Sequence, residues 1–430
     1  MLSAFANALK IPELRGKILF TFAMIAIYRL GSYIPVPGAD YAAIRQFLDA
    51  PQNNGTNGAY NLINLFSGGA LTQFAIFALG IMPYITSSII MQLLGVVIPR
   101  LEALRKEGEA GQKKIQQYTR LVTVGLALLQ SAGIITLASN SQLLQGVNIF
   151  PGIWWGRFLL ALLTLTAGTA LIMWIGELIT QRGIGNGMSI LIFASIVSQL
   201  PSQGGAILQS KGAWIFAGVC ALGLVIIVLV ITVEQAQRRI PVQYAKRMVG
   251  RKMFGGSSTY IPLKVNQAGV IPIIFASSLL YLPVLLSSIM NRPWLTNFVT
   301  RYFQRGDHPA YIIAYFVLII AFAYFYNSIA FNPVDTADNM KKYGGFIPGI
   351  RPGRQTAEYL NNILTRITLP GSLFLALIAI VPFLLQNISG TAQQFPFGGT
   401  AILITVGVGL ETMKQIESQL MMRNYEGFLR

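Results

Sequence analysis

Few side chains in this sequence have the chemistry for catalysis or for holding a metal. The 430 residues contain one cysteine, Cys220, and one histidine, His308, which excludes an internal disulfide and any site built from several cysteines or histidines. No phosphate-binding GxxxxGK(S/T) loop and no HExxH pair occurs. Ser67, in FSGG, would need His308, from an external loop, as its partner in a serine protease. We therefore expect no enzyme activity, no metal site and no cofactor.

The elements that carry these side chains have the composition of membrane helices. Hydrophobic residues make up 53% of the chain and charged residues 11%, against about 25% charged in a soluble domain. A membrane-spanning helix needs about 20 mostly apolar residues. The sequence therefore predicts an all-α membrane protein with ten transmembrane helices, at about 18–36, 74–98, 121–139, 154–175, 186–201, 213–233, 268–289, 310–331, 367–387 and 400–413.

The basic residues predict how these spans are oriented. Of the 32 Lys and Arg, 25 fall in the termini and loops of one side and six on the other, while Arg29 lies within the first span. Because basic loops remain on the cytoplasmic side, both termini should be cytoplasmic. We expect an N-terminal half at 1–201 with spans 1–5 and a C-terminal half at 202–430 with spans 6–10.

Two similar segments suggest that these halves are inverted repeats. GIMPYITSSII begins at Gly80 in span 2, and GVIPIIFASSLL begins at Gly269 in span 7. Each has Gly-x-x-Pro and then a serine pair, and the two spans should run in opposite directions. Inverted repeats place the functional path at their interface, here a central pore between two five-helix halves. Pro83 and Pro272 should kink their spans.

Two long cytoplasmic loops, at about 234–267 and 332–366, hold 12 of the 25 cytoplasmic Lys and Arg. Topology needs only a few of these charges, so we expect the loops to be ordered and to dock a large cytoplasmic partner. The net charge of +17 also suits anionic lipids or an RNA surface.

The external segment at about 60–72 is short, apolar and followed by Gly68 and Gly69. It could lie on the membrane surface. It could also fold back into a cavity, where non-helical backbone is tolerated beside protein or water. The residues alone leave both alternatives open.

The spans are almost free of charge, which suits a pore closed at a hydrophobic constriction. The alternative is an inverted-repeat secondary transporter. Such a transporter requires ionisable groups within its spans to bind the coupling ion, and an essential mid-membrane carboxylate would favour it.

Several longer stretches give the sequence a family resemblance. It resembles the SecY family, the central subunits of the bacterial protein-conducting channel, over nearly its whole length. The stretches that carry the resemblance are NLFSGGALTQFAIFALGIMPYITSSII from Asn64, GIGNGMSILIF from Gly183, QRRIPVQYAKR from Gln237, PLKVNQAGVIPIIFASS from Pro262, GGFIPGIRPG from Gly344 and QLMMRNYEGFL from Gln419.

The resemblance implies a role for each of three groups of residues. A ring of aliphatic side chains would close the pore at Ile81, Ile85, Met188, Ile192, Ile274 and Ile404. A plug would lie below the ring, at Leu62, Ile63, Asn64, Leu65, Phe66, Ser67, Gly68 and Gly69. A lateral gate between spans 2–3 and 7–8 would carry Thr86, Ser87, Gln130, Ser277 and Ser278. Met188 departs from the usual β-branched residue, and its flexible side chain should seal less tightly.

The resemblance also implies partners and a location. A docking surface for the SecA ATPase or the ribosome would include Arg238, Arg239, Lys246, Arg247, Arg251, Lys252 and Arg351. Small SecE-like and SecG-like membrane subunits, signal peptides and unfolded secretory chains are the other expected partners. The expected function is to pass unfolded secretory polypeptides across the cytoplasmic (inner) membrane and to release hydrophobic segments sideways into it.

Overall fold

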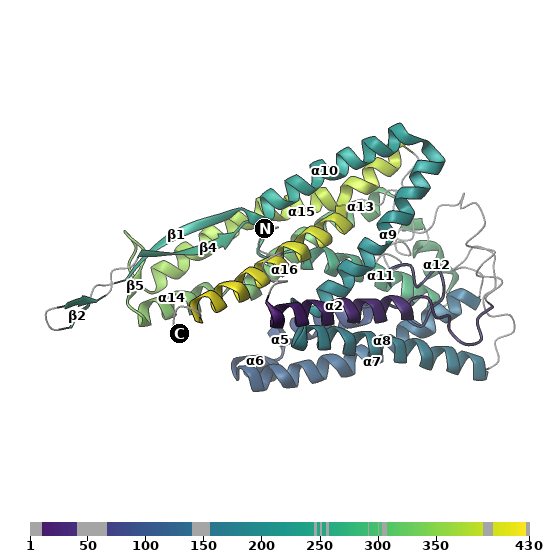
Figure 1. Ribbon diagram of the computed structural model, residues 1–430, viewed down its shortest axis with the longest axis horizontal. Helices are drawn as coiled ribbons and strands as arrows, with labels where there is room; N and C mark the ends of the chain where they lie inside the picture. The colour runs from purple at the N-terminus through teal and green to yellow at the C-terminus, as the bar shows by residue number, and fades with distance from the viewer. Residues whose placement is uncertain are drawn as a thin grey trace.

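The computed structural model describes residues 11–40, 67–139, 155–244, 247–249, 252–254, 258–290, 292–299, 301–302, 308–389 and 399–426. Long helices dominate these residues (Figure 1). The helices are α2 (Pro12–Gly31), α5 (Met82–Val97), α6 (Pro99–Lys106), α7 (Glu109–Ser139), α8 (Trp155–Arg182), α9 (Gly187–Lys211), α10 (Ala213–Gln235), α11 (Ile271–Met290), α12 (Pro293–Val299), α13 (Pro309–Ala330), α14 (Pro333–Lys342), α15 (Arg354–Ser389) and α16 (Gly399–Glu426).

Each predicted span overlaps one of these helices, but several helices extend beyond the apolar stretch. α9 and α16 have 25 and 28 residues, although their predicted spans are short. Six described helices are long and apolar enough to cross a membrane by length and composition, or seven if α5 and α6, which meet at 99°, form one broken span. α2 and α16 carry more charge near their ends, as the sequence shows.

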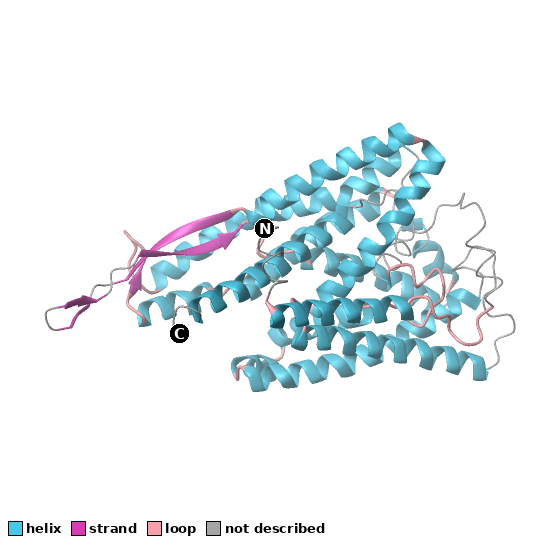
Figure 2. Ribbon diagram, in the orientation of Figure 1, coloured by secondary structure: helices cyan, strands magenta, loops and turns pink. Residues whose placement is uncertain are grey.

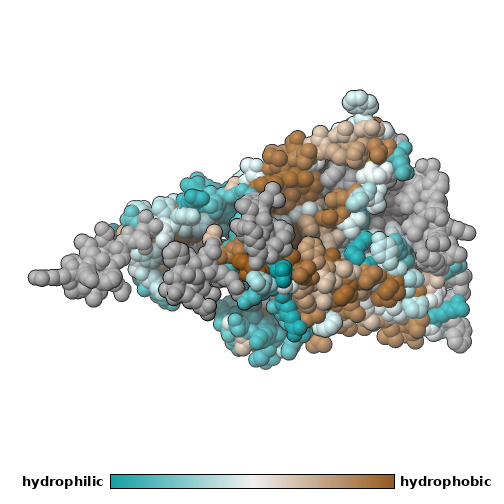
Figure 3. All heavy atoms as spheres, in the orientation of Figure 1, coloured by the Kyte–Doolittle hydropathy of each residue, from teal (hydrophilic) through white to brown (hydrophobic). Residues whose placement is uncertain are grey.

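The helical part of the molecule exposes an apolar surface. α10 has a mean hydropathy of 3.0 over its most apolar stretch, yet only 17% of that stretch is buried. Trp214, Leu224 and Val228 on this helix are among its exposed side chains. Figure 3 shows hydrophobic residues over the helices and hydrophilic residues towards the end that carries the sheet. Such a surface is stable in lipid rather than in water.

A small sheet lies at one end of the helices (Figure 2). Strand β1 (Gln237–Tyr244) pairs antiparallel with both β4 (Ser258–Lys264) and β5 (Gly345–Phe346) in this sheet. β2 (Arg247–Val249) and β3 (Lys252–Phe254) pair with each other in a separate two-stranded sheet. Side chains alternate along β1, so Ile240 and Val242 are buried while Arg239 is exposed. The buried face packs on Met340 of α14 and Leu360 of α15. The described parts of both predicted loops thus contain regular structure, and the sequence analysis had not predicted strands there.

The two repeated segments begin their helices in the same way. Gly80 and Gly269 both have positive φ, +56° and +58°, a conformation that costs glycine little. Three residues later, Pro83 and Pro272 fall in the first turns of α5 and α11. The predicted kinks at these prolines were wrong, because a first-turn residue has no helical N–H bond to lose. Span 2 also begins later than predicted, since residues 74–81 form turns.

Helices from both ends of the chain meet on one side of the molecule. Leu14 and Ile18 of α2 share a hydrophobic cluster with Ile416 of α16 and with Ile184, which lies between α8 and α9. The start of the first long helix and the later part of the last one are therefore neighbours.

Candidate functional site

All six residues of the expected ring contact the same hydrophobic cluster. Ile81, Met188, Ile192 and Ile404 are buried within it, while Ile85 and Ile274 pack against it and are partly buried. They come from the start of α5, from α9, α11 and α16, so four segments distant in sequence converge. Tyr28, Phe77 and Met82 belong to the same cluster as the isoleucines of the ring. Aliphatic side chains, closely packed, leave no polar surface to hold water.

The expected plug is described only from Ser67 onward, and Leu62 to Phe66 lie outside the described residues. Gly68 and Gly69 have φ of +66° and +88°, which supports a sharp turn of the backbone there. Arg29 Nη1 donates to the Gly68 carbonyl at 2.9 Å. Tyr28 Oη lies 2.7 Å from Ser195 Oγ and donates to the Ser67 carbonyl at 3.4 Å. Residues 67–69, which we call the plug root, are thus held between α2 and α9.

The plug root continues directly into the ring cluster. Ala70 belongs to that cluster, together with Ile81 and Ile404. Ser67 is fully buried, and its Oγ accepts a hydrogen bond from the Leu71 N–H. His308 accepts from the Ala310 N–H as the N-cap of α13. Both residues of the suspected protease pair therefore serve local backbone structure.

The helices of the expected gate form two packed pairs that touch. α5 packs against α7, α11 packs against α13, and α11 also contacts both α5 and α7. Ser87 of α5 donates to the Thr119 carbonyl of α7 at 2.7 Å. Thr86 and Ser277 donate to carbonyls of their own helices, those of Met82 and Ile274. We call the contact between the α5–α7 pair and the α11–α13 pair the seam. The three hydroxyls form hydrogen bonds within one pair and, among the described residues, none across the seam.

Two further gate residues are buried at this seam or near it. Ser278 is 5% exposed, and within the described part of the chain no partner accepts a hydrogen bond from its hydroxyl. Gln130, on α7, is 4% exposed. The structure thus places all five expected gate residues on α5, α7 and α11, in buried positions.

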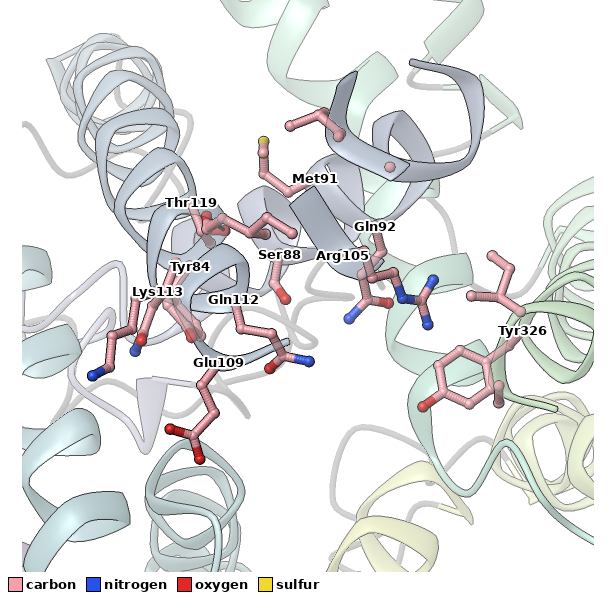
Figure 4. Close-up of a pocket in the computed structure, with 16 residues that line it drawn as sticks. Tyr84, Ser88, Met91, Gln92, Arg105, Glu109, Gln112, Lys113, Thr119 and Tyr326 are labelled. Carbon is pink, nitrogen blue, oxygen red and sulfur yellow. Dashed lines mark hydrogen bonds between the residues drawn. The ribbon is translucent and has the colours of Figure 1, made fainter. Parts of the chain in front are cut away.

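A groove of about 650 Å³ opens between α5, α6, α7 and α13 (Figure 4). Its lining is mixed. Met91 and Ile329 are apolar, whereas Gln92, Gln112 and Arg105 are polar. Tyr326 of α13 faces the α5–α7 wall across it. The sequence analysis missed this groove, because its walls come from segments more than 200 residues apart.

A second hollow, of about 270 Å³, lies between α2, α9 and α16 and is lined almost entirely by apolar atoms, among them those of Phe22, Ile184 and Met413. Its lining differs from that of the groove, because it has almost no polar atoms to form hydrogen bonds with a polar chain.

The sequence analysis also missed an ion pair behind the groove, between a buried glutamate and a partly exposed arginine. Arg120 of α7 donates to both carboxylate oxygens of Glu177 on α8, at 2.7 and 2.6 Å. Gln116, which lines the groove, donates to the same carboxylate at 3.2 Å. The only sequence signal is that each charge stands at the edge of a long uncharged stretch.

The expected docking residues lie around the small sheet. Arg238 and Arg239 are exposed on β1, and the Arg239 guanidinium lies over the Tyr260 ring at 4.9 Å. Arg247 and Lys252 are on β2 and β3. Lys246 and Arg251 lie outside the described residues. The pairing of β1 with β5 joins the two basic loops into one body.

Arg351 follows β5 and is exposed, between two glycines in the left-handed region. Gly349 and Gly353 on either side have φ of +81° and +108°. The Arg351 carbonyl accepts a hydrogen bond from Thr356 Oγ1 at 2.9 Å, and the described residues offer its guanidinium no ion pair. This arginine is therefore available to an anionic partner.

Together these features define a class of protein. A bundle of apolar helices encloses a hydrophobic cluster on which the six expected ring residues converge, two helix pairs meet at a groove, and a basic sheet extends from one end. This is the arrangement of a polytopic membrane protein with a candidate pore at its centre.

Comparison with known proteins supports the same class. The family model described as SecY matches residues 75–413. The chain is 59% identical to the protein translocase subunit SecY of Streptomyces galbus over 440 residues, covering 100% of both. It shares its fold with a solved protein-conducting channel, with a TM-score of 0.64, 17% identity and 96% of each chain covered. The Sec61 chain of the canine ribosome–channel complex gives a TM-score of 0.60 at 16% identity, also over 96% of each.

The chain belongs to the SecY family of protein translocase subunits. It is thus a multi-pass membrane protein and a non-enzymatic channel subunit of the translocase, and the transporter alternative has no support among these relatives.

Proposed function

We propose that this chain forms the pore through which unfolded secretory polypeptides cross the cytoplasmic membrane, with ten helices spanning that membrane in two inverted halves. The convergence of the six ring residues, from four segments distant in sequence, on one hydrophobic cluster carries this proposal. The matching starts of α5 and α11, with Gly80 and Gly269 at positive φ, support the inverted halves. The adjacency of α2 and α16 supports two cytoplasmic termini.

The ring closes the resting pore by excluding water. Aliphatic side chains form no hydrogen bonds, so a narrow passage lined by them dewets and blocks ions. The same property lets a polypeptide pass, because no side chain of the ring binds a passing residue strongly. Met188, which packs within the cluster, adjusts its shape more easily than a β-branched residue.

The plug root keeps the resting seal in place. Arg29 and Tyr28 of α2 donate to the carbonyls of Gly68 and Ser67, and the Tyr28 hydroxyl is also hydrogen-bonded to Ser195 of α9. The glycines of the plug root supply the backbone freedom for the segment to swing when a polypeptide enters. The 60–72 segment was expected either to lie on the membrane surface or to fold back into a cavity. In its described part Ser67, Ala70 and Leu71 are buried, which supports the second alternative.

The seam between the α5–α7 pair and the α11–α13 pair is the lateral gate. When the pairs separate, an apolar segment in the pore comes into contact with lipid and leaves sideways. The mixed lining of the groove suits an amphipathic entering segment, because apolar and polar side chains both find partners there.

The basic sheet and Arg351 form the docking surface for a cytoplasmic motor or the ribosome, the expected SecA ATPase among them. Exposed guanidinium groups bind carboxylates and phosphates with paired hydrogen bonds. The Sec61 relative was solved on a ribosome, which supports an RNA surface as one partner. SecE-like and SecG-like subunits and anionic lipids complete the proposed assembly.

Reconstitution tests the proposal. The chain, purified with its small membrane subunits and placed in vesicles, should admit an unfolded secretory protein into the lumen when a cytoplasmic ATPase and ATP are added. Protection of that protein from external protease is the measurement. Transport of a small solute in exchange for ions, without passage of any polypeptide, would overturn the proposal.

A further inference from the structure

The ion pair between α7 and α8 has the geometry of a clamp. Arg120 presents Nε and Nη2 to the two oxygens of Glu177, and Gln116 adds a third hydrogen bond to the same carboxylate. The Glu177 side chain is only 10% exposed, and that of Arg120 is 41% exposed. Paired hydrogen bonds from a planar guanidinium fix both the distance and the orientation of two helices.

The clamp joins a helix of the expected gate to a helix that contacts the plug-root helices. α7 forms a wall of the groove and contacts α11 across the seam. α8 packs against α2 and α9, the two helices that hold the plug root. Gln116 takes part in both, since it lines the groove and also binds Glu177.

Because the Glu177 carboxylate is buried, loss of its partner Arg120 should strongly weaken the attachment of α7 to α8. Charged groups removed from water are stable only while they are paired and hydrogen-bonded. The exposed pair between Lys106 and Glu102 on α6, at 2.8 Å, has no such dependence, because water solvates either partner when the other is lost. It provides a control from the same side of the molecule.

We propose that Arg120, Glu177 and Gln116 are positioning residues that fix α7 to α8 and thereby hold the α7 wall against α11 in the closed gate. This rests on the proposed lateral gate. When the clamp is lost, α7 moves away from α11 more easily. A signal segment then needs fewer apolar residues to open the gate.

The test compares two exported reporters, one with an intact signal segment and one whose segment has been shortened by several leucines. Glu177→Gln and Arg120→Gln should raise export of the weak-signal reporter relative to the intact one by about five-fold or more, the scale of a modest coupling between sites. Arg120→Lys, which keeps the charge but not the fork, should give a smaller rise. Lys106→Gln should leave the ratio unchanged.

A double variant, Arg120→Met with Glu177→Met, separates positioning from mere stability. It removes both charges and keeps apolar packing, so the protein should insert at the parental level. Export of the weak-signal reporter relative to the intact one should still rise. A parental ratio in this variant and in both single variants, at normal protein levels, would overturn the clamp. In that case export of the intact-signal reporter continues, whereas failure of the proposed channel function would abolish export of both reporters.

Discussion

The centre of the bundle and the sheet at its end differ in what their side chains are free to contact. In the ring cluster the aliphatic residues are packed against one another, and Ile81 and Ile404 are each 1% exposed. In the sheet only one face is covered, by α14 and α15, and the arginines of β1 remain exposed. In the proposed channel the first region excludes water and strong binding, whereas the second offers charge to a partner. The proposed channel, driven by a cytoplasmic partner, needs both.

The comparison predicts that a change in the sheet region stops transport without opening the pore. Arg351→Glu should abolish coupling to the motor or ribosome, because it replaces an available guanidinium by a carboxylate that repels an anionic partner. The protein should still insert, and the vesicles should remain tight to ions. Motor-driven translocation and ion leakage, measured on the same preparation, check this.

Arg354→Glu is the matched control for that variant. Arg354 is already paired with Glu358 one helical turn away, and an exposed pair of this kind contributes about 0.5 kcal/mol. Its loss should reduce translocation only slightly. Full translocation by the Arg351→Glu variant would show that this arginine only helps to set the topology.

A change in the ring should have the opposite effect, opening the pore without affecting docking. Ile85→Asn and Ile404→Asn put amides into a dry constriction, which should then stay wet and leak ions. Ile402→Asn is the control, since Ile402 is buried on the same helix in a different cluster. Leakage through the control but not through the ring variants would place the seal elsewhere.

Alanine substitutions in the plug root should cause an intermediate ion leak. The size of the leak should depend on the space available to the added Cβ rather than on the backbone φ. A Cβ added at Gly68 would lie 3.2 Å from Ser195 Cα, while one at Gly69 meets no atom within 4 Å. Both glycines have positive φ, so both alanine variants carry a similar backbone cost of about 1 kcal/mol. Gly68→Ala should therefore leak more than Gly69→Ala in a resting-channel conductance assay. Equal leakage would separate the plug root from the seal.

The smallest effects are expected at the gate hydroxyls. Ser87→Ala removes the bond to the Thr119 carbonyl, a contact worth about 0.6–2 kcal/mol within a membrane, and should loosen α5 from α7. Ser278→Ala removes a buried hydroxyl that has no partner among the described residues, so it should leave the closed gate as stable or slightly more so. Export of the weak-signal reporter should rise in the first variant only. A rise in both would mean that burial at the seam, rather than this bond, sets the gate.

Sequence reasoning reached the helices and the basic loops because both follow from local composition. Apolar length predicts a span, and Lys and Arg accumulate where no span is present. It did not predict the strands, since β1 is only eight residues long. The alternation of buried and exposed side chains along β1 becomes visible only when β4 and β5 pair with it. It also placed Pro83 inside a span, because composition does not distinguish an apolar turn from the first turn of a helix.

The site was harder to predict than the fold because its parts meet only in three dimensions. Periodicity does not separate Ile404 from Ile402, which lie two residues apart and belong to different clusters. The ring residues came from the family resemblance alone. The bond between Arg120 and Glu177 joins residues 57 positions apart, and a single sequence contains nothing that pairs them.

Contact between a moving polypeptide and the ring tests the central claim most directly. The native Cys220 is replaced by serine, and single cysteines are placed at Ile85, at Ile404 or at Met413, which lines the apolar hollow on the same helix as Ile404. A secretory chain stalled halfway across and carrying one cysteine is then cross-linked. The account predicts cross-links at positions 85 and 404 and none above background at 413. Cross-linking mainly at 413, or equally at all three, would contradict it.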